Sequence, residues 1–134
     1  MVKNNFNCAK IKSVIQKNYH NLDFGVTALA EKTGMSASYL GEITGIHFNM
    51  SPQALIETVR LEASLKLLAG EDRVYQICSQ VGYMNCKTFR IAFKKRLQKT
   101  PSQCRKMLQA SGDVKREIQA VTAQLWNGIC QNFR

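Results

Sequence analysis

Cationic side chains gather in one part of this 134-residue sequence. Residues 73–106 contain nine lysines and arginines and no aspartate or glutamate. The nine are Arg73, Lys87, Arg90, Lys94, Lys95, Arg96, Lys99, Arg105 and Lys106. Residues 21–72, in contrast, carry seven acidic side chains and three basic ones. A cationic stretch of this density gives one end of the molecule a strong positive potential, which favours a nucleic-acid backbone as partner. The alternative is a solvated basic face that binds nothing.

Cysteine and histidine are spaced too widely to predict a metal site. The five cysteines form no Cys-x-x-Cys pair, and His20 and His47 lie far apart in the sequence. We therefore expect neither zinc ligation nor a disulfide framework. No His/Cys or His/Ser constellation and no phosphate loop is present, so we expect no enzyme activity and no cofactor. The apolar runs are too short for a membrane span and no signal-peptide pattern opens the chain, which predicts a cytoplasmic protein.

The cationic stretch lies in a chain whose apolar residues recur at helical spacing, which predicts an all-α fold. Gly34 and Gly82 each follow a short predicted helix and precede a second helix with its own cap, at Ser36 and at Asn85. This recurrence predicts two helix-turn-helix units. Between them, a long helix is predicted from Ser51-Pro52 to about residue 69, and about 17 residues span roughly 26 Å. The aromatic and thioether residues of both units are expected in the core, namely Tyr39, Tyr83, Met84, Phe89 and Phe93.

Three segments of the sequence resemble the DNA-binding domain of AraC/XylS-type transcription regulators. They are GMSASYL at 34–40, RLEASLKLL at 60–68 and VGYMNCKTFRIAFKKRLQKTPSQCR at 81–105. The resemblance covers about residues 22–108. It implies two helix-turn-helix subdomains joined by one long helix. Each subdomain places its recognition helix in one major groove, and the two grooves are adjacent on one face of the duplex. Such grooves lie about 34 Å apart, and a rigid helix of this length holds two units near that separation.

In the second unit, the resemblance places the recognition helix at about residues 85–95. Cys86, Lys87 and Arg90 match the positions at which the family reads base edges, and lysine or arginine donates well to guanine O6 and N7. Cys86 is either a small residue against a thymine methyl group or a half-buried inert thiol. Phosphate contacts are expected at both helix starts and along the basic run, from Ser36, Asn85, Lys94, Lys95, Arg96 and Lys99. Gln98 stands where the family has a glycine, so we expect a different turn geometry there.

The first unit departs from the family pattern. Its recognition helix, at about residues 36–44, offers Ser38, Gly41 and Glu42 for base contacts. Glu42 repels phosphates, although a carboxylate accepts a hydrogen bond from cytosine N4. After this helix we expect a loose stretch over residues 45–50. Either this unit reads DNA weakly or it serves another surface, and we expect the two units to be used unequally.

A separate amphipathic helix is predicted after the hinge at residues 111–112. Its apolar seam consists of Val114, Ile118, Val121, Leu125 and Trp126. This seam either docks onto the chain's own first helix or forms a surface for a homodimer or a coactivator protein.

The sequence as a whole predicts a bacterial transcription regulator that binds double-stranded DNA and most often activates through RNA polymerase. The expected parts are an N-terminal helix (1–20), a first helix-turn-helix unit (21–50), a linker helix (51–70), a second unit (71–110) and a C-terminal extension (111–134). We expect a nucleoid-associated protein without a small-molecule ligand in this chain. The competing hypothesis is a protein-interaction module that kept the fold and binds another regulator.

Overall fold

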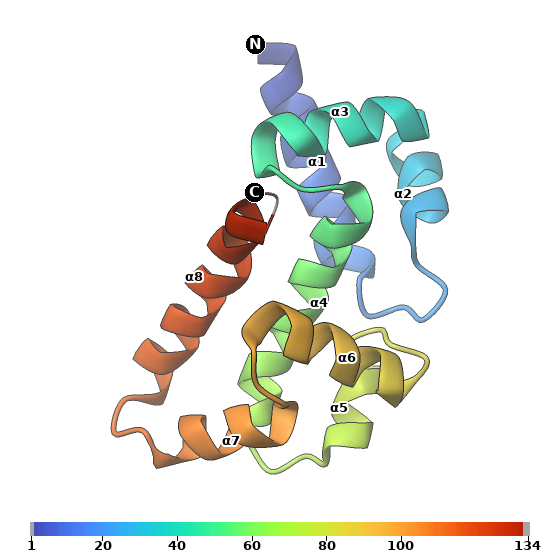
Figure 1. Cartoon of the computed structure of the whole chain (residues 1–134). Coiled ribbons are helices and arrows are strands. Elements are labelled where there is room, and N and C mark those ends of the chain that lie inside the picture. Colours follow the sequence, from blue (N-terminus) through green and yellow to red (C-terminus); the bar gives the residue numbers. More distant parts are fainter. Residues whose placement is uncertain (1, 133–134) are drawn as a thin grey trace.

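The computed structural model describes the backbone of residues 2–132 and the side chains of residues 6–127. Within this range the chain forms eight helices and no strand, so the predicted all-α fold is confirmed (Figure 1). The helices are α1 (Val2–Asn18), α2 (Val26–Thr33), α3 (Ala37–Phe48), α4 (Pro52–Leu68), α5 (Val74–Gln80), α6 (Cys86–Leu97), α7 (Pro101–Ala110) and α8 (Val114–Asn132). None of the described helices has the length and apolar character needed to cross a membrane.

Local capping explains where the central helices begin. Ser51 accepts a hydrogen bond from the backbone N–H of Ala54, and Pro52 occupies the first turn of α4. Thr100 accepts from the N–H of Gln103, whose side chain in turn accepts from the N–H of Thr100. These contacts satisfy backbone donors that have no partner inside the helix. The linker helix covers Pro52–Leu68, whereas the sequence predicted a helix from Ser51-Pro52 to about residue 69.

Two turns differ from the sequence prediction. Helix α3 continues through Phe48, so most of the stretch expected to be loose is helical. It closes on Asn49, which adopts the left-handed conformation with φ 59°. Gln98 does the same after α6, with φ 60°. The turn that was expected to use another geometry thus keeps the backbone form that glycine favours, with glutamine at that position.

Two hydrophobic cores lie along the linker helix, one for each unit. The first contains residues of α1, α2 and α3 with the N-terminal half of α4, and the second contains residues of α5, α6, α7 and α8 with its C-terminal half. Phe89 and Phe93 are fully buried, as predicted. Tyr83 is buried and Tyr39 half-buried. Met84 is 75% exposed in the turn before α6, so its prediction as a core residue is wrong.

Arg60 of the linker helix joins the two units from within. Its guanidinium donates to the carbonyl oxygens of Tyr19 (2.9 Å) and Phe24 (2.8 Å) in the loop after α1. It also lies 5.7 Å from the ring of Tyr83 in the second unit. The adjacent Gly82 has φ +99°, and a Cβ there would lie 2.1 Å from the carbonyl oxygen of Tyr19. Only glycine allows the turn of the second unit to approach this loop so closely.

The C-terminal helix α8 packs against α4, α6 and α7, and Figure 1 shows it alongside the linker helix. Val121 and Leu125 are 4% and 1% exposed in the second core. Val114, Ile118 and Trp126 are half-buried. Two predictions are therefore corrected. The seam docks mainly on α4, α6 and α7 instead of the first helix, and Val121 and Leu125 are not available as a dimer or coactivator surface. The last two residues of the predicted extension, 133 and 134, lie outside the described range.

Candidate nucleic-acid interface

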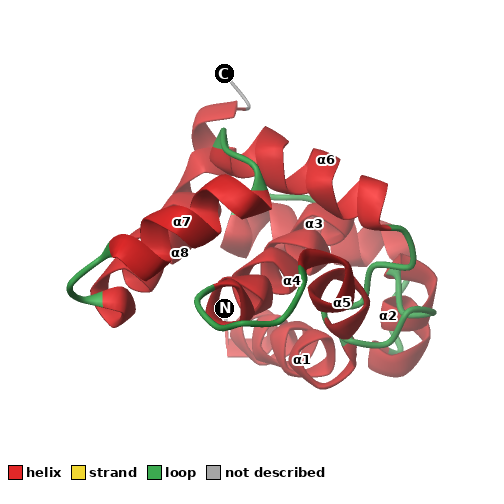
Figure 2. Ribbon diagram, turned by 90° about the horizontal axis from the view of Figure 1, so that it is seen from below, coloured by secondary structure: helices red, strands yellow, loops and turns green. Residues whose placement is uncertain are grey.

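The second helix of each helix-turn-helix unit lies on the same side of the molecule. In Figure 1, α3 and α6 lie one above the other, near opposite ends of α4, and Figure 2 places both on the side of α4 away from α1. Gly82 allows the chain to turn between α5 and α6, and Gly34, with φ 73°, allows it to turn between α2 and α3. The fold thus presents two helices to one side, as two adjacent grooves of a duplex require.

Helix α6 begins with a strong local cap. The Asn85 side-chain oxygen accepts from the backbone N–H groups of Lys87 (2.7 Å) and Thr88 (3.4 Å). Asn85 is exposed, so the predicted cap is present at a position open to solvent. Its oxygen already accepts from two helix N–H groups, so the predicted contact of Asn85 with a phosphate would have to come from its amide N–H group. Ser36 caps α3 in the same way, since its side chain accepts from the N–H of Tyr39 (3.1 Å).

The outward face of α6 is cationic. Lys87, Arg90, Lys94 and Lys95 are all exposed. In the part of the chain that the structure describes, none of these four side chains forms an ion pair. Their charges are therefore not neutralised within the protein, which leaves them available to a polyanion.

Ile91 lies in the middle of this cationic face and was missed by the sequence analysis. It is 59% exposed, and Thr88, one turn earlier, is exposed as well. The spacing of Ile91 from Phe89 in the sequence could have indicated this exposure. Ile91 follows the buried Phe89 by two residues, which corresponds to about 200° around a helix. An exposed branched side chain there provides an apolar surface among donors, and such a surface suits a thymine methyl group.

Cys86 lies between the outward face and the core. It is half-buried and packs against the second core, which contains Cys78. Burial, together with the contact with the Cys86 thiol, raises the pKa of Cys78 to about 11. Of the two interpretations of Cys86, this placement favours the half-buried thiol.

Arg96 was predicted to contact phosphate, and the structure contradicts this. Its side chain is buried and donates to Glu57 Oε1 (2.7 Å), to Thr58 Oγ1 (2.5 Å) and to the carbonyl oxygen of Leu125 (3.1 Å). Arg96 thus fixes α6 to α4 and α8. Lys99 is half-buried, with its Nζ 3.8 Å from the sulfur of Met107, so it lies at the edge of the cationic face.

Helix α3 offers a different surface. Ser38 and Glu42 are exposed and Gly41 is half-buried. The helix contains no lysine or arginine, and its exposed residues include Ile46, at 63%. A Cβ added at Gly41 or Gly45 would meet no atom within 4 Å, so there is open space at both positions. The three predicted base-contacting residues therefore lie on a helix without lysine or arginine, and two of them, Ser38 and Glu42, are exposed.

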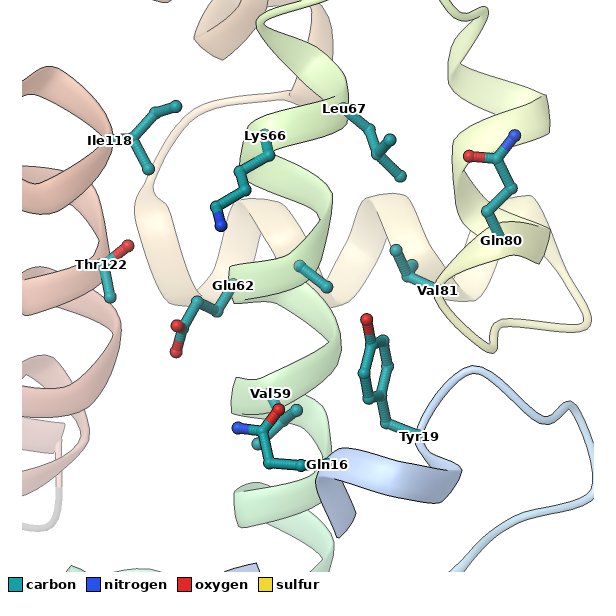
Figure 3. A pocket seen from close by; sticks show the side chains of 11 residues that line it. Gln16, Tyr19, Val59, Glu62, Lys66, Leu67, Gln80, Val81, Ile118 and Thr122 are labelled. Atoms are coloured by element: carbon teal, nitrogen blue, oxygen red, sulfur yellow. The ribbon is translucent and has the colours of Figure 1, made fainter. Parts of the chain in front are cut away.

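A cavity of about 340 Å³ lies on another side of the linker helix (Figure 3). Its floor is the α4 face that carries Val59, Glu62 and Lys66, opposite the face that holds Leu61 and Leu65 in the second core. Residues of α1, α5 and α8 form its walls. The cavity is thus separate from the cationic face of α6. Among the described residues, no group of three or more side chains is arranged to hold a metal ion.

Known proteins resemble this chain across the two units. The helix-turn-helix domain family matches residues 29–107. The raffinose operon transcriptional regulatory protein RafR of Pediococcus pentosaceus is 35% identical over 97 residues, which cover 72% of this chain and 35% of that protein. The Msm operon regulatory protein of Streptococcus mutans is 32% identical over 101 residues, or 75% of this chain and 36% of that protein. The chain thus spans about a third of the length of these curated relatives.

A solved structure agrees with the arrangement of the helices. The C-terminal domain of AraT, a response regulator from Geobacillus stearothermophilus, has a TM-score of 0.73 and 27% sequence identity, and the match covers 79% of this chain and 88% of that one. The family match includes the linker helix, both helices of the second unit and most of the first unit, whereas α8 lies beyond it. The chain therefore belongs to the AraC-type helix-turn-helix family of DNA-binding transcription regulators.

Proposed function

We propose that this protein regulates transcription by binding a specific sequence of double-stranded DNA, mainly through α6 in the major groove. The proposal depends on the exposed cations of α6, none of which forms an ion pair among the described residues. The turns at the two ends of α6 and the buried Arg96 hold this helix in place. An α-helix fits the B-DNA major groove, where base edges present distinct hydrogen-bonding patterns.

The residues of α6 divide into two groups by the contacts they suit. Lys87 and Arg90, near the start of the helix, donate to guanine O6 and N7, and Ile91 contacts a thymine methyl group. Lys94 and Lys95, near its end, neutralise phosphates and fix the register without reading sequence. A good bidentate contact to a base contributes about 1–3 kcal/mol of discrimination.

The first unit contributes less in this proposal. Glu42 disfavours nearby phosphates, while the small side chains of Ser38, Gly41 and Gly45 let the helix backbone approach the duplex closely. Bound at the neighbouring groove, α3 adds contact area and orientation. Activation by contact with RNA polymerase, in a bacterial nucleoid, is the regulatory output that we propose.

Binding-site selection from random duplexes, followed by a salt titration, tests the proposal. We expect one selected sequence. For the two phosphates that Lys94 and Lys95 neutralise, the log–log slope is about −1.8, so the affinity falls about 12-fold between 50 and 200 mM salt. A selection that enriches no sequence, with an affinity that does not depend on salt, would refute the proposal.

A second candidate function is a protein-interaction module that binds another regulator. The exposed Glu42 and Ile46 on a helix without lysine or arginine favour this alternative. It predicts weak DNA binding at every salt concentration, together with a partner whose capture is lost in Ile46→Glu. The same titration therefore separates the two candidates.

A further inference from the structure

The C-terminal helix α8 contacts both units at two adjacent residues, Leu125 and Trp126. Trp126 packs against the first core as well as the second. Its ring lies 6.3 Å from that of Phe48, between centroids, and Lys12 Nζ lies 5.4 Å from its centroid. Its indole N–H donates to Glu62 Oε1 at 2.7 Å. One side chain thus connects α8 to α1, α3 and α4.

Leu125 makes the corresponding connection to the second unit. Its side chain is 1% exposed in the second core, and its carbonyl oxygen accepts from Arg96 of α6 at 3.1 Å. Phe48 is the last residue of α3, and Arg96 is next to last in α6. Two consecutive residues of α8 therefore hold the C-terminal ends of the two helices that face the duplex. Figure 1 shows the C-terminal half of α8 passing between these ends.

This connection through α8 adds to the linker helix and to the contacts of Arg60 and Gly82 with the loop after α1. The cavity in Figure 3 lies against the α4 face that carries Glu62 and Lys66, so packing between this face and α1, α5 and α8 is incomplete. Glu62, in the floor of this cavity, is the residue that accepts from the indole N–H of Trp126. Without α8, relative motion of the units is resisted by α4, by the contacts of Arg60 and by the close approach of Gly82 to Tyr19.

We propose that α8, through Trp126, sets the orientation of the first unit relative to the second and so allows both to engage adjacent grooves at once. The inference rests on DNA binding by both units as proposed above. When two binding modules are held in a matching geometry, the second contact is intramolecular and raises the overall affinity. Trp126 is thus a positioning residue that does not touch the duplex.

The test uses two duplexes that carry the selected sequence, one covering both grooves and one shortened to the groove of α6. For Trp126→Ala we expect the affinity for the long duplex to fall about tenfold, because the first unit no longer docks in register. The affinity for the short duplex is expected to stay within about twofold of wild type. Hydroxyl-radical footprints on the long duplex should keep the α6 patch and lose the α3 patch.

Two further variants keep the test decisive. Trp126→Leu retains apolar volume but removes the indole donor and the ring contacts, and should show the same selective loss if the alanine variant does not fold. Gln124→Ala is the control, because Gln124 is exposed on α8 and contacts Gln98, in the second unit. Equal losses on both duplexes, or no loss on either, would overturn the inference. A wild-type protein that binds neither duplex would refute the proposed function, and this inference with it.

Discussion

Replacing Arg96 by alanine separates a structural role from a DNA contact. The substitution removes three hydrogen bonds, to Glu57, Thr58 and the carbonyl oxygen of Leu125. Removing one partner of a buried ion pair costs about 3–5 kcal/mol. Glu57 is 30% exposed and regains water when the arginine is lost, which lowers this cost. Thr58 is fully buried and remains without this donor. We therefore expect the free energy of unfolding to decrease by about 3 kcal/mol, or roughly 10 °C in Tm.

Urea unfolding followed by circular dichroism at 222 nm measures this change. Lys95→Ala is the matched control, since Lys95 is the preceding residue and is exposed. Its free energy of unfolding should stay within about 0.5 kcal/mol of wild type. The salt dependence of DNA binding should respond in the opposite way. The Lys95 variant loses about 0.9 from the log–log slope, and the Arg96 variant, measured where it is folded, keeps the wild-type slope.

Two results would refute this reasoning about Arg96. One is an Arg96→Ala protein as stable as wild type, which would mean that the three hydrogen bonds contribute nothing net. The other is a slope reduced as in the Lys95 variant, which would return Arg96 to the phosphate contacts that the sequence first suggested.

Three more predictions follow from single residues. Gly82→Ala should decrease the free energy of unfolding by about 3 kcal/mol or more in thermal melts, because the added Cβ would overlap the Tyr19 carbonyl oxygen. Gly45→Ala is the control: its added Cβ lies in open space on α3, so the free energy of unfolding should instead rise by about 0.5–1 kcal/mol. Ile91→Ala should leave thermal stability within about 0.5 kcal/mol but relax base preference at one position in repeated site selection, and an unchanged preference would remove Ile91 from the reading face. Burial raises the pKa of the Cys78 thiol to about 11 from 9.0, so the unfolded chain loses this proton at lower pH than the folded protein. The free energy of unfolding should therefore fall by at most about 2–3 kcal/mol between pH 9 and 11. Cys78→Ala should show a shallower decline, and an equal decline would assign the effect to other groups.

Much of the fold was predictable from the sequence because it depends on local signals. Ser51-Pro52 and Thr100-Pro101 combine a cap with a residue suited to a first turn, so the starts of α4 and α7 could be predicted. Gly82 marked the turn of the second unit by its residue type alone. The end of α3 could not be placed in this way, because its last turn is held by packing of Phe48 against the first core.

The site was harder to predict, because burial depends on contacts between distant segments. Arg96 shares the spacing of Phe89 and Phe93, so helical periodicity alone places it on the buried side. Its charge suggested phosphate instead, and its partners, Glu57 and Leu125, are 39 and 29 residues away. The apolar seam of α8 was predicted, but nothing local indicates that α4, α6 and α7 cover it.

We have proposed that the exposed face of α6 binds duplex DNA. The most direct measurement is a titration of the ¹⁵N-labelled protein with the selected duplex, followed by amide chemical shifts. We expect the largest shifts on residues 85–95, with smaller shifts on α3 and little change at the cavity residues of α4. Shifts centred on α3 or on the cavity, with α6 unchanged, would contradict this proposal.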